Sequence, residues 1–88
     1  MDAKAQIMFE QLQMFKIELE DRLTTYLAED IVAFMEGFDY INEGLASGDS
    51  DSVIRGNVII QKVLGREPQF TTQQEFDDLM ESDEAFVF

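Results

Sequence analysis

Carboxylates dominate the groups in this chain that could take part in chemistry: 19 of its 88 residues are aspartate or glutamate, and it has no histidine and no cysteine. The most common general base and the best nucleophile are therefore both absent. Two carboxylates can hydrolyse a glycosidic bond, but only around a cleft that holds a sugar, and a chain of this size encloses a small core. We expect no catalytic residues and no enzymatic activity.

The stretch 49–51, Asp-Ser-Asp, is the only one whose spacing could begin a metal site, because a calcium-binding loop starts with alternating oxygen ligands. The rest of the pattern is missing. The sixth position is Ile54, where glycine is needed, and the twelfth is Ile60, where a bidentate glutamate is needed. We interpret the stretch as a loop in which a side chain from residues 50–52 caps the next helix. We expect no metal and no cofactor.

The chain has a formal net charge of -13. The positions of the charged residues along the chain are more informative than this total. No lysine or arginine occurs between Ala28 and Ile54. A field of this sign repels nucleic acid and anionic membranes, and it attracts basic proteins at rates that fall as the salt concentration rises. The expected partner is a basic protein, without direct contact to nucleic acid or a membrane.

The first candidate site lies in this cation-free stretch, where Glu29, Glu36 and Glu43 recur every seven residues and share one side of a helix. Asp39 and Tyr40 lie between the last two. We predict that these carboxylates meet lysine or arginine of a partner and that Tyr40 anchors the contact, because rigid amphipathic aromatic side chains often carry binding energy. The alternative is a solvated face with an exposed ring. Seven helical residues span about 10.5 Å, so mimicry of DNA would need further acids interleaved in space.

The second candidate site is the C-terminal region: Asp77, Asp78, Glu81 and Phe88. Acids followed by Phe86-Val87-Phe88 would place two aromatic rings and a carboxylate on a tether suited to a basic pocket. Over its last few residues only, this ending resembles in style the acidic, phenylalanine-ended tips of single-stranded-DNA-binding proteins. In the alternative, the two phenylalanines pack back onto the core of their own domain.

Helices must position these acids, because residues 1–45 contain no proline and no glycine before Gly37. Two apolar stripes predict buried faces, and they consist of Met8, Leu12, Phe15 and Leu19, and of Leu27, Ile31, Phe34, Phe38, Ile41 and Leu45. The two stripes lie about a quarter turn apart. One unbroken helix would be about 68 Å long, whereas a compact chain of this length has a radius of gyration of about 12 Å.

We therefore predict a bend or break between Leu23 and Asp30, where Thr24 and Thr25 are candidate caps. The alternative is a homodimer built on one long helix and buried through the first stripe.

The C-terminal half predicts two shorter helices. In the first, about 52–64, the apolar residues Val53, Gly56, Ile59, Ile60, Val63 and Leu64 form the buried arc, while Ile54 and Val58 point away from it. We attribute Gly56 to the close approach of a neighbouring helix. Gly65 and Pro68 then end the helix.

Thr72 and Glu75 form a capping box that begins the last helix, about 72–81, with Phe70 and Phe76 near the arrangement of a hydrophobic staple. That helix is expected to bury Phe76, Leu79 and Met80.

The sequence thus predicts an all-α fold, a small bundle of three to four helices in a single domain over residues 1–88, with residues 82–88 as a candidate flexible tail. No apolar run approaches the roughly 20 residues of a membrane span, and the N-terminus lacks the plan of a secretory signal, so we expect a cytoplasmic protein. We expect a small acidic binding protein of bacterial or phage type that occupies a basic site on a partner, as inhibitors, immunity factors, antitoxins and nucleic-acid mimics do. The alternative is a structural or assembly subunit that homodimerises through its N-terminal helix.

Overall fold

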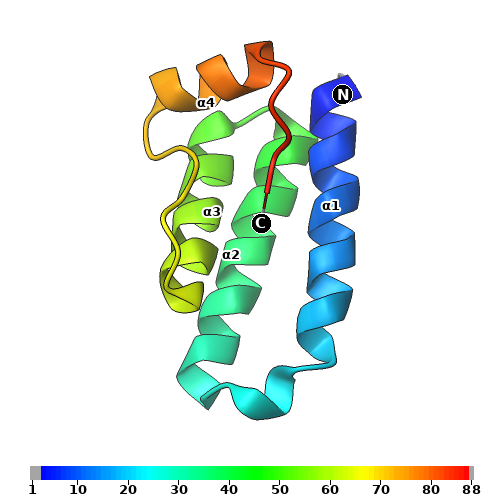
Figure 1. Ribbon diagram of the computed structural model, residues 1–88, viewed down its shortest axis with the longest axis vertical. Helices are drawn as coiled ribbons and strands as arrows, with labels where there is room; N and C mark the ends of the chain where they lie inside the picture. Colours follow the sequence, from blue (N-terminus) through cyan, green and yellow to red (C-terminus); the bar gives the residue numbers. More distant parts are fainter. Residues whose placement is uncertain (1–2, 88) are drawn as a thin grey trace.

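The computed structural model describes residues 3–87. Within this range the chain forms four α-helices joined by connecting segments. They are α1 (Ala3–Glu20), α2 (Ala28–Ser47), α3 (Ser50–Leu64) and α4 (Gln73–Glu81). As Figure 1 shows, α2 lies between α1 and α3, and α4 crosses the end of the bundle where α2 ends and α3 begins. The predicted all-helical bundle is confirmed.

The N-terminal segment is broken, as predicted: α1 ends at Glu20, a 3₁₀ turn, η1, occupies Leu23–Thr25, and α2 begins at Ala28. The Thr25 hydroxyl donates to the carbonyl oxygen of Arg22 (2.7 Å) inside this turn. The capping role expected of the two threonines is wrong, because residues 26 and 27 separate the turn from α2, and Leu27 precedes α2 without a side-chain cap.

The first apolar stripe, through which the alternative homodimer was expected to form, is largely buried within its own chain. Met8, Leu12 and Leu19 are at most 4% exposed, because they face the core of their own chain. The radius of gyration is 12.5 Å, close to the value of about 12 Å expected for a compact chain. Leu27 was expected to be buried with the second stripe but is 65% exposed, since it lies in the turn before α2.

Glycines bring α2 and α3 into close contact. A Cβ atom on Gly37 would lie 2.9 Å from the carbonyl oxygen of Gly56, and one on Gly44 would lie 2.6 Å from Cγ2 of Val53. Contacts this short leave no room for a side chain. The prediction that Gly56 marks the close approach of a neighbouring helix is confirmed.

The buried arc of α3 is wider than its apolar pattern predicts. Ile54, expected to point outwards, is 8% exposed, and the polar residues Asn57 and Gln61 are 0% and 3% exposed. Gln61 Nε2 donates to Asn57 Oδ1 (3.3 Å) within this buried region. The reason is that α3 contacts α2 on one side and α4 on another, so more than one stripe of the helix leaves water.

At the start of α3, the capping interpretation of the Asp-Ser-Asp loop is confirmed, but the capping residue differs. Asp49 Oδ1 accepts from the backbone N–H groups of Asp51 (3.1 Å) and Ser52 (3.4 Å). The helix therefore begins at Ser50, two residues before the predicted start.

The signals around α4 behave as predicted. Gly65 ends α3 at a φ of 72°, in the left-handed region, and the Thr72 hydroxyl accepts from the Glu75 N–H (3.2 Å). The rings of Phe70 and Phe76 meet edge to face with centroids 5.1 Å apart. The Glu75 carboxylate also accepts from the backbone N–H of Thr71 (3.3 Å), one residue before the cap.

Residues 82–87 lie against the bundle. Phe86 is 3% exposed and stacks on Phe70, with ring centroids 5.5 Å apart. Lys4 Nζ donates to the carbonyl oxygens of Ser82 (2.9 Å) and Glu84 (2.7 Å). The reading in which the C-terminal phenylalanines pack onto their own core therefore describes Phe86, whereas Phe88 lies outside the described residues.

Candidate functional site

The acids predicted on α2 share the side of that helix that faces away from the core. Glu29, Glu36, Asp39 and Glu43 are all exposed, and the opposite side carries the buried residues Phe34, Phe38, Ile41 and Leu45. From Glu29 to Glu43 the face extends about 21 Å along the helix, at about 1.5 Å per residue. We call these four carboxylates the α2 acidic face.

Tyr40 lies at the edge of this face rather than on it. Its side chain is half-buried, and the guanidinium carbon of Arg55 on α3 lies 5.5 Å from the centre of its ring. This is the geometry of a cation–π contact. One side of the ring is thus occupied by the chain's own arginine, and only the remainder can meet a partner.

Besides Arg55, the basic side chains of Lys4 and Arg66 also contact other parts of the chain instead of the α2 acidic face. Lys4 on α1 donates to the backbone carbonyl oxygens of Ser82 and Glu84. The guanidinium carbon of Arg66 lies 6.0 Å from the ring centre of Phe15. The positive charges of these residues, like that of Arg55, therefore serve internal packing contacts.

The second group of candidate residues occupies a different surface, the outer side of α4. Asp77, Asp78 and Glu81 are exposed, and the first two accept hydrogen bonds of 2.9 Å from the amides of Gln73 and Gln74 one turn earlier.

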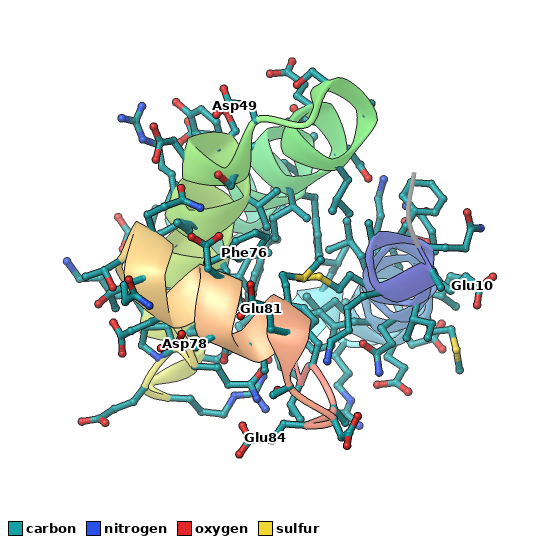
Figure 2. The ribbon with its side chains drawn as sticks, turned by 90° about the horizontal axis from the view of Figure 1, so that it is seen from above. Glu10, Asp49, Phe76, Asp78, Glu81 and Glu84 are labelled. Carbon is teal, nitrogen blue, oxygen red and sulfur yellow. The ribbon has the colours of Figure 1, made fainter. Side chains whose placement is uncertain are left out.

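Figure 2 looks onto this end of the bundle and shows Asp78 and Glu84 on one edge, Asp49 on the opposite edge, and Glu10 on the outside of α1. The acids of α4 thus lie on the helix that crosses the end of the bundle where α2 ends (Figure 1). The remaining predicted contact, Phe88, lies outside the described residues.

A groove between α1 and α2 is a feature that the sequence reasoning missed. It has a volume of about 290 Å³ and is lined by Lys16, Leu19, Glu20, Leu23, Ile31, Phe34, Met35, Phe38 and Asp39. Asp39 belongs both to the groove and to the α2 acidic face. The sequence feature that could have indicated this groove is the four-residue spacing of Ile31, Met35 and Asp39, which places them on one side of a helix.

Within residues 3–87, no group of three or more acidic side chains is placed to hold a metal ion. In the same part of the chain, none of the helices combines the length and the apolar character that crossing a membrane requires. The candidate residues described above lie on the α2 acidic face and on the outer side of α4, and the groove between α1 and α2 adjoins the first of these surfaces.

Comparison with known proteins adds no relative, because no protein-family description, curated protein or solved structure matches this chain.

Proposed function

We propose that this protein binds a basic site on another protein through the α2 acidic face. The observation that carries the proposal is the exposure of Glu29, Glu36, Asp39 and Glu43 on one side of one helix, in a stretch without lysine or arginine. Like charges held along a rigid helix repel each other, and a partner that supplies the opposite charge relieves this repulsion. Inhibitors, immunity factors and antitoxins are classes of protein that act by occupying such a site.

The binding free energy of such a contact is spread over several weak ion pairs. Exposed carboxylates contribute little individually, about 0.2 to 1 kcal/mol for each exposed ion pair. Together they speed association and fix the orientation of the partner. Because these charges are exposed, salt screens them with a Debye length of about 8 Å at physiological ionic strength. Binding should therefore weaken as salt increases, mainly through the association rate.

The test begins with capture of partners on the immobilised protein from a lysate of its native host at low and at high salt. A captured basic protein is then purified, and its Kd is measured as a function of salt concentration. An affinity that does not weaken with salt would remove the electrostatic basis of the proposal.

A matched pair of variants locates the contact. Glu36→Gln with Glu43→Gln neutralises two charges on α2, and Glu10→Gln with Glu18→Gln neutralises two exposed charges on α1. Both variants change the net charge equally, so a general charge effect would weaken binding equally in both. We expect the α2 variant to raise Kd about fivefold and the α1 variant to change it less. Equal effects would argue against the α2 acidic face as the site.

The alternative function, a subunit that homodimerises, loses the face predicted for it, since Met8, Leu12 and Leu19 lie in the core of their own chain. Light scattering over a dilution series, combined with the capture experiment, separates the two functions.

A further inference from the structure

We propose that the groove between α1 and α2 receives an apolar side chain from an amphipathic helix of the basic partner, and that Glu20 and Asp39 hold lysine or arginine residues flanking that side chain. This inference rests on the proposed function and specifies the chemistry of the partner. It adds an apolar anchor to a contact that would otherwise consist of surface charges.

The apolar part of the groove is suited to such an anchor. Leu23 and Ile31 are half-buried in its wall, and Met35 is 61% exposed although it is large and apolar. A volume of about 290 Å³ is nearly twice that of a cavity of about 150 Å³ that accepts benzene. The groove therefore has room for a leucine or phenylalanine side chain. Methionine adapts to partners of different shape, which suits Met35 to this position.

The charges around the groove indicate what flanks the anchor. Glu20 lines it from α1 and Asp39 from α2, and both are exposed, whereas Lys16 is half-buried. Acids are therefore present on both helical walls of an apolar groove. A partner helix with an apolar residue between lysines or arginines is complementary to this pattern, and binding of a helix in a groove between helices is a common mode of recognition.

The position of Asp39 links the groove to the α2 acidic face. Asp39 lines the groove, and Glu36 and Glu43 follow on the adjoining exposed surface of the same helix. Residues Ile31 to Asp39 extend about 12 Å along α2, at about 1.5 Å per residue. This length corresponds to about two turns of a partner helix, which is enough to place one apolar side chain and a basic residue on either side of it.

The methionine methyl groups make it possible to test directly whether a partner enters the groove. Met35 lines the groove and is 61% exposed, Met14 on α1 is 65% exposed but does not line this groove, and Met8 is fully buried. The full chain is labelled with ¹³C on its methionine methyl groups and titrated with two peptides of equal length and charge. One is a helical peptide of lysine with leucine along one side, and the other carries alanine in place of leucine.

We expect the leucine peptide to shift the Met35 methyl signal while the Met14 signal stays in place, and to bind more weakly as salt increases. Met35→Ala and Asp39→Asn should each raise the Kd of this peptide, by about tenfold for Met35→Ala. Met14→Ala is the matched control, since it removes an equally exposed methionine, and it should leave Kd unchanged. The alanine peptide should bind more weakly and leave Met35 unperturbed.

The two proposals fail in different ways. If neither peptide binds at low salt, the acidic-surface function is refuted together with the groove. If both peptides bind with equal affinity and the Met35 signal does not move, or if Met35→Ala and Met14→Ala have equal effects, only the groove inference is refuted.

Discussion

Gly37 on α2 and Gly56 on α3 face each other so closely that a methyl group on either would collide with the backbone carbonyl oxygen of the other. On α3, the arc that includes Gly56 also presents Ile60, and Ile60 Cγ1 would lie 2.6 Å from a Cβ atom on Gly37. This contact fixes the rotation of α2 about its own axis. It therefore decides that Glu29, Glu36 and Glu43 face solvent and that Met35 and Asp39 border α1.

Gly56→Ala should destabilise the protein. On an isolated helix the change would stabilise by about 1 kcal/mol, but here the new methyl group forces α2 and α3 apart, at an overpacking cost of about 1 to 3 kcal/mol. We therefore expect a net loss of up to about 2 kcal/mol. Urea unfolding followed by circular dichroism measures it. A stabilised variant would show that the helices separate without cost and would contradict the close contact.

Glu75 should make stability depend on pH. Hydrogen bonds from the Thr71 hydroxyl and backbone N–H, and from the Thr72 hydroxyl, lower the pKa of its carboxyl below the ordinary value of 4.5. A carboxyl with a lowered pKa in the folded state contributes stability that is complete above its ordinary pKa and is lost as pH falls through the lowered one. Glu75→Gln should therefore unfold at lower urea than the natural protein at neutral pH.

In acid, once Glu75 is protonated, that difference in unfolding midpoint should vanish. A difference that persists or grows as pH falls below the lowered pKa would mean that the negative charge of Glu75 is not what stabilises the start of α4.

Phe86→Ala should weaken the whole fold. Phe86 is 3% exposed and stacked on Phe70, and truncation of a buried phenylalanine costs about 3 to 5 kcal/mol. Total stability for a domain of this size lies near the lower end of the usual range of about 5 to 15 kcal/mol, so most of it would be lost. Val87→Ala, at a neighbouring residue that is 58% exposed, is the control and should change stability by less than about 0.5 kcal/mol. Equal effects of the two variants would mean that the segment is not docked.

Asn57 and Gln61 should be replaceable together but not singly. Asn57 Oδ1 accepts from Gln61 Nε2, while the buried Nδ2 of Asn57 has no hydrogen-bond partner among the described residues. Replacing both partners by apolar residues of similar shape is often neutral or stabilising, whereas leaving one buried polar group unpaired costs about 1 to 3 kcal/mol.

We therefore expect the double variant Asn57→Leu, Gln61→Met to match or exceed the natural protein in urea midpoint, and Asn57→Leu alone to fall below the double variant. A double variant less stable than the single one would show that the polar pair supports the core.

The features of the fold that were predicted from sequence depend on residues close to one another in the chain. Thr72 caps the helix that contains Glu75, Gly65 ends α3, and Phe70 meets Phe76, each within a few residues of its partner. The break after Glu20 followed from two apolar stripes that one straight helix could not bury together. The acids of α2 were assigned to one side from their spacing alone.

The features that were missed depend on which elements lie next to each other. Ile54 is buried, although its place in the apolar pattern of α3 pointed outwards, and α3 contacts α4 as well as α2. Tyr40 loses part of its exposure to Arg55, fifteen residues away in the sequence. The groove beside Met35 forms only because the turn after α1 brings Glu20 and Leu23 alongside Ile31 and Asp39.

The sequence alone determined that this chain forms amphipathic helices with carboxylates on the side away from the apolar residues, because helix periodicity and end signals act over one or two turns. Only the tertiary structure decided which faces stay accessible, through the contact of Gly37 with Gly56 and the docking of Phe86. The physical reason is that burial is shared between two surfaces, and a single helix does not specify the element that will cover it.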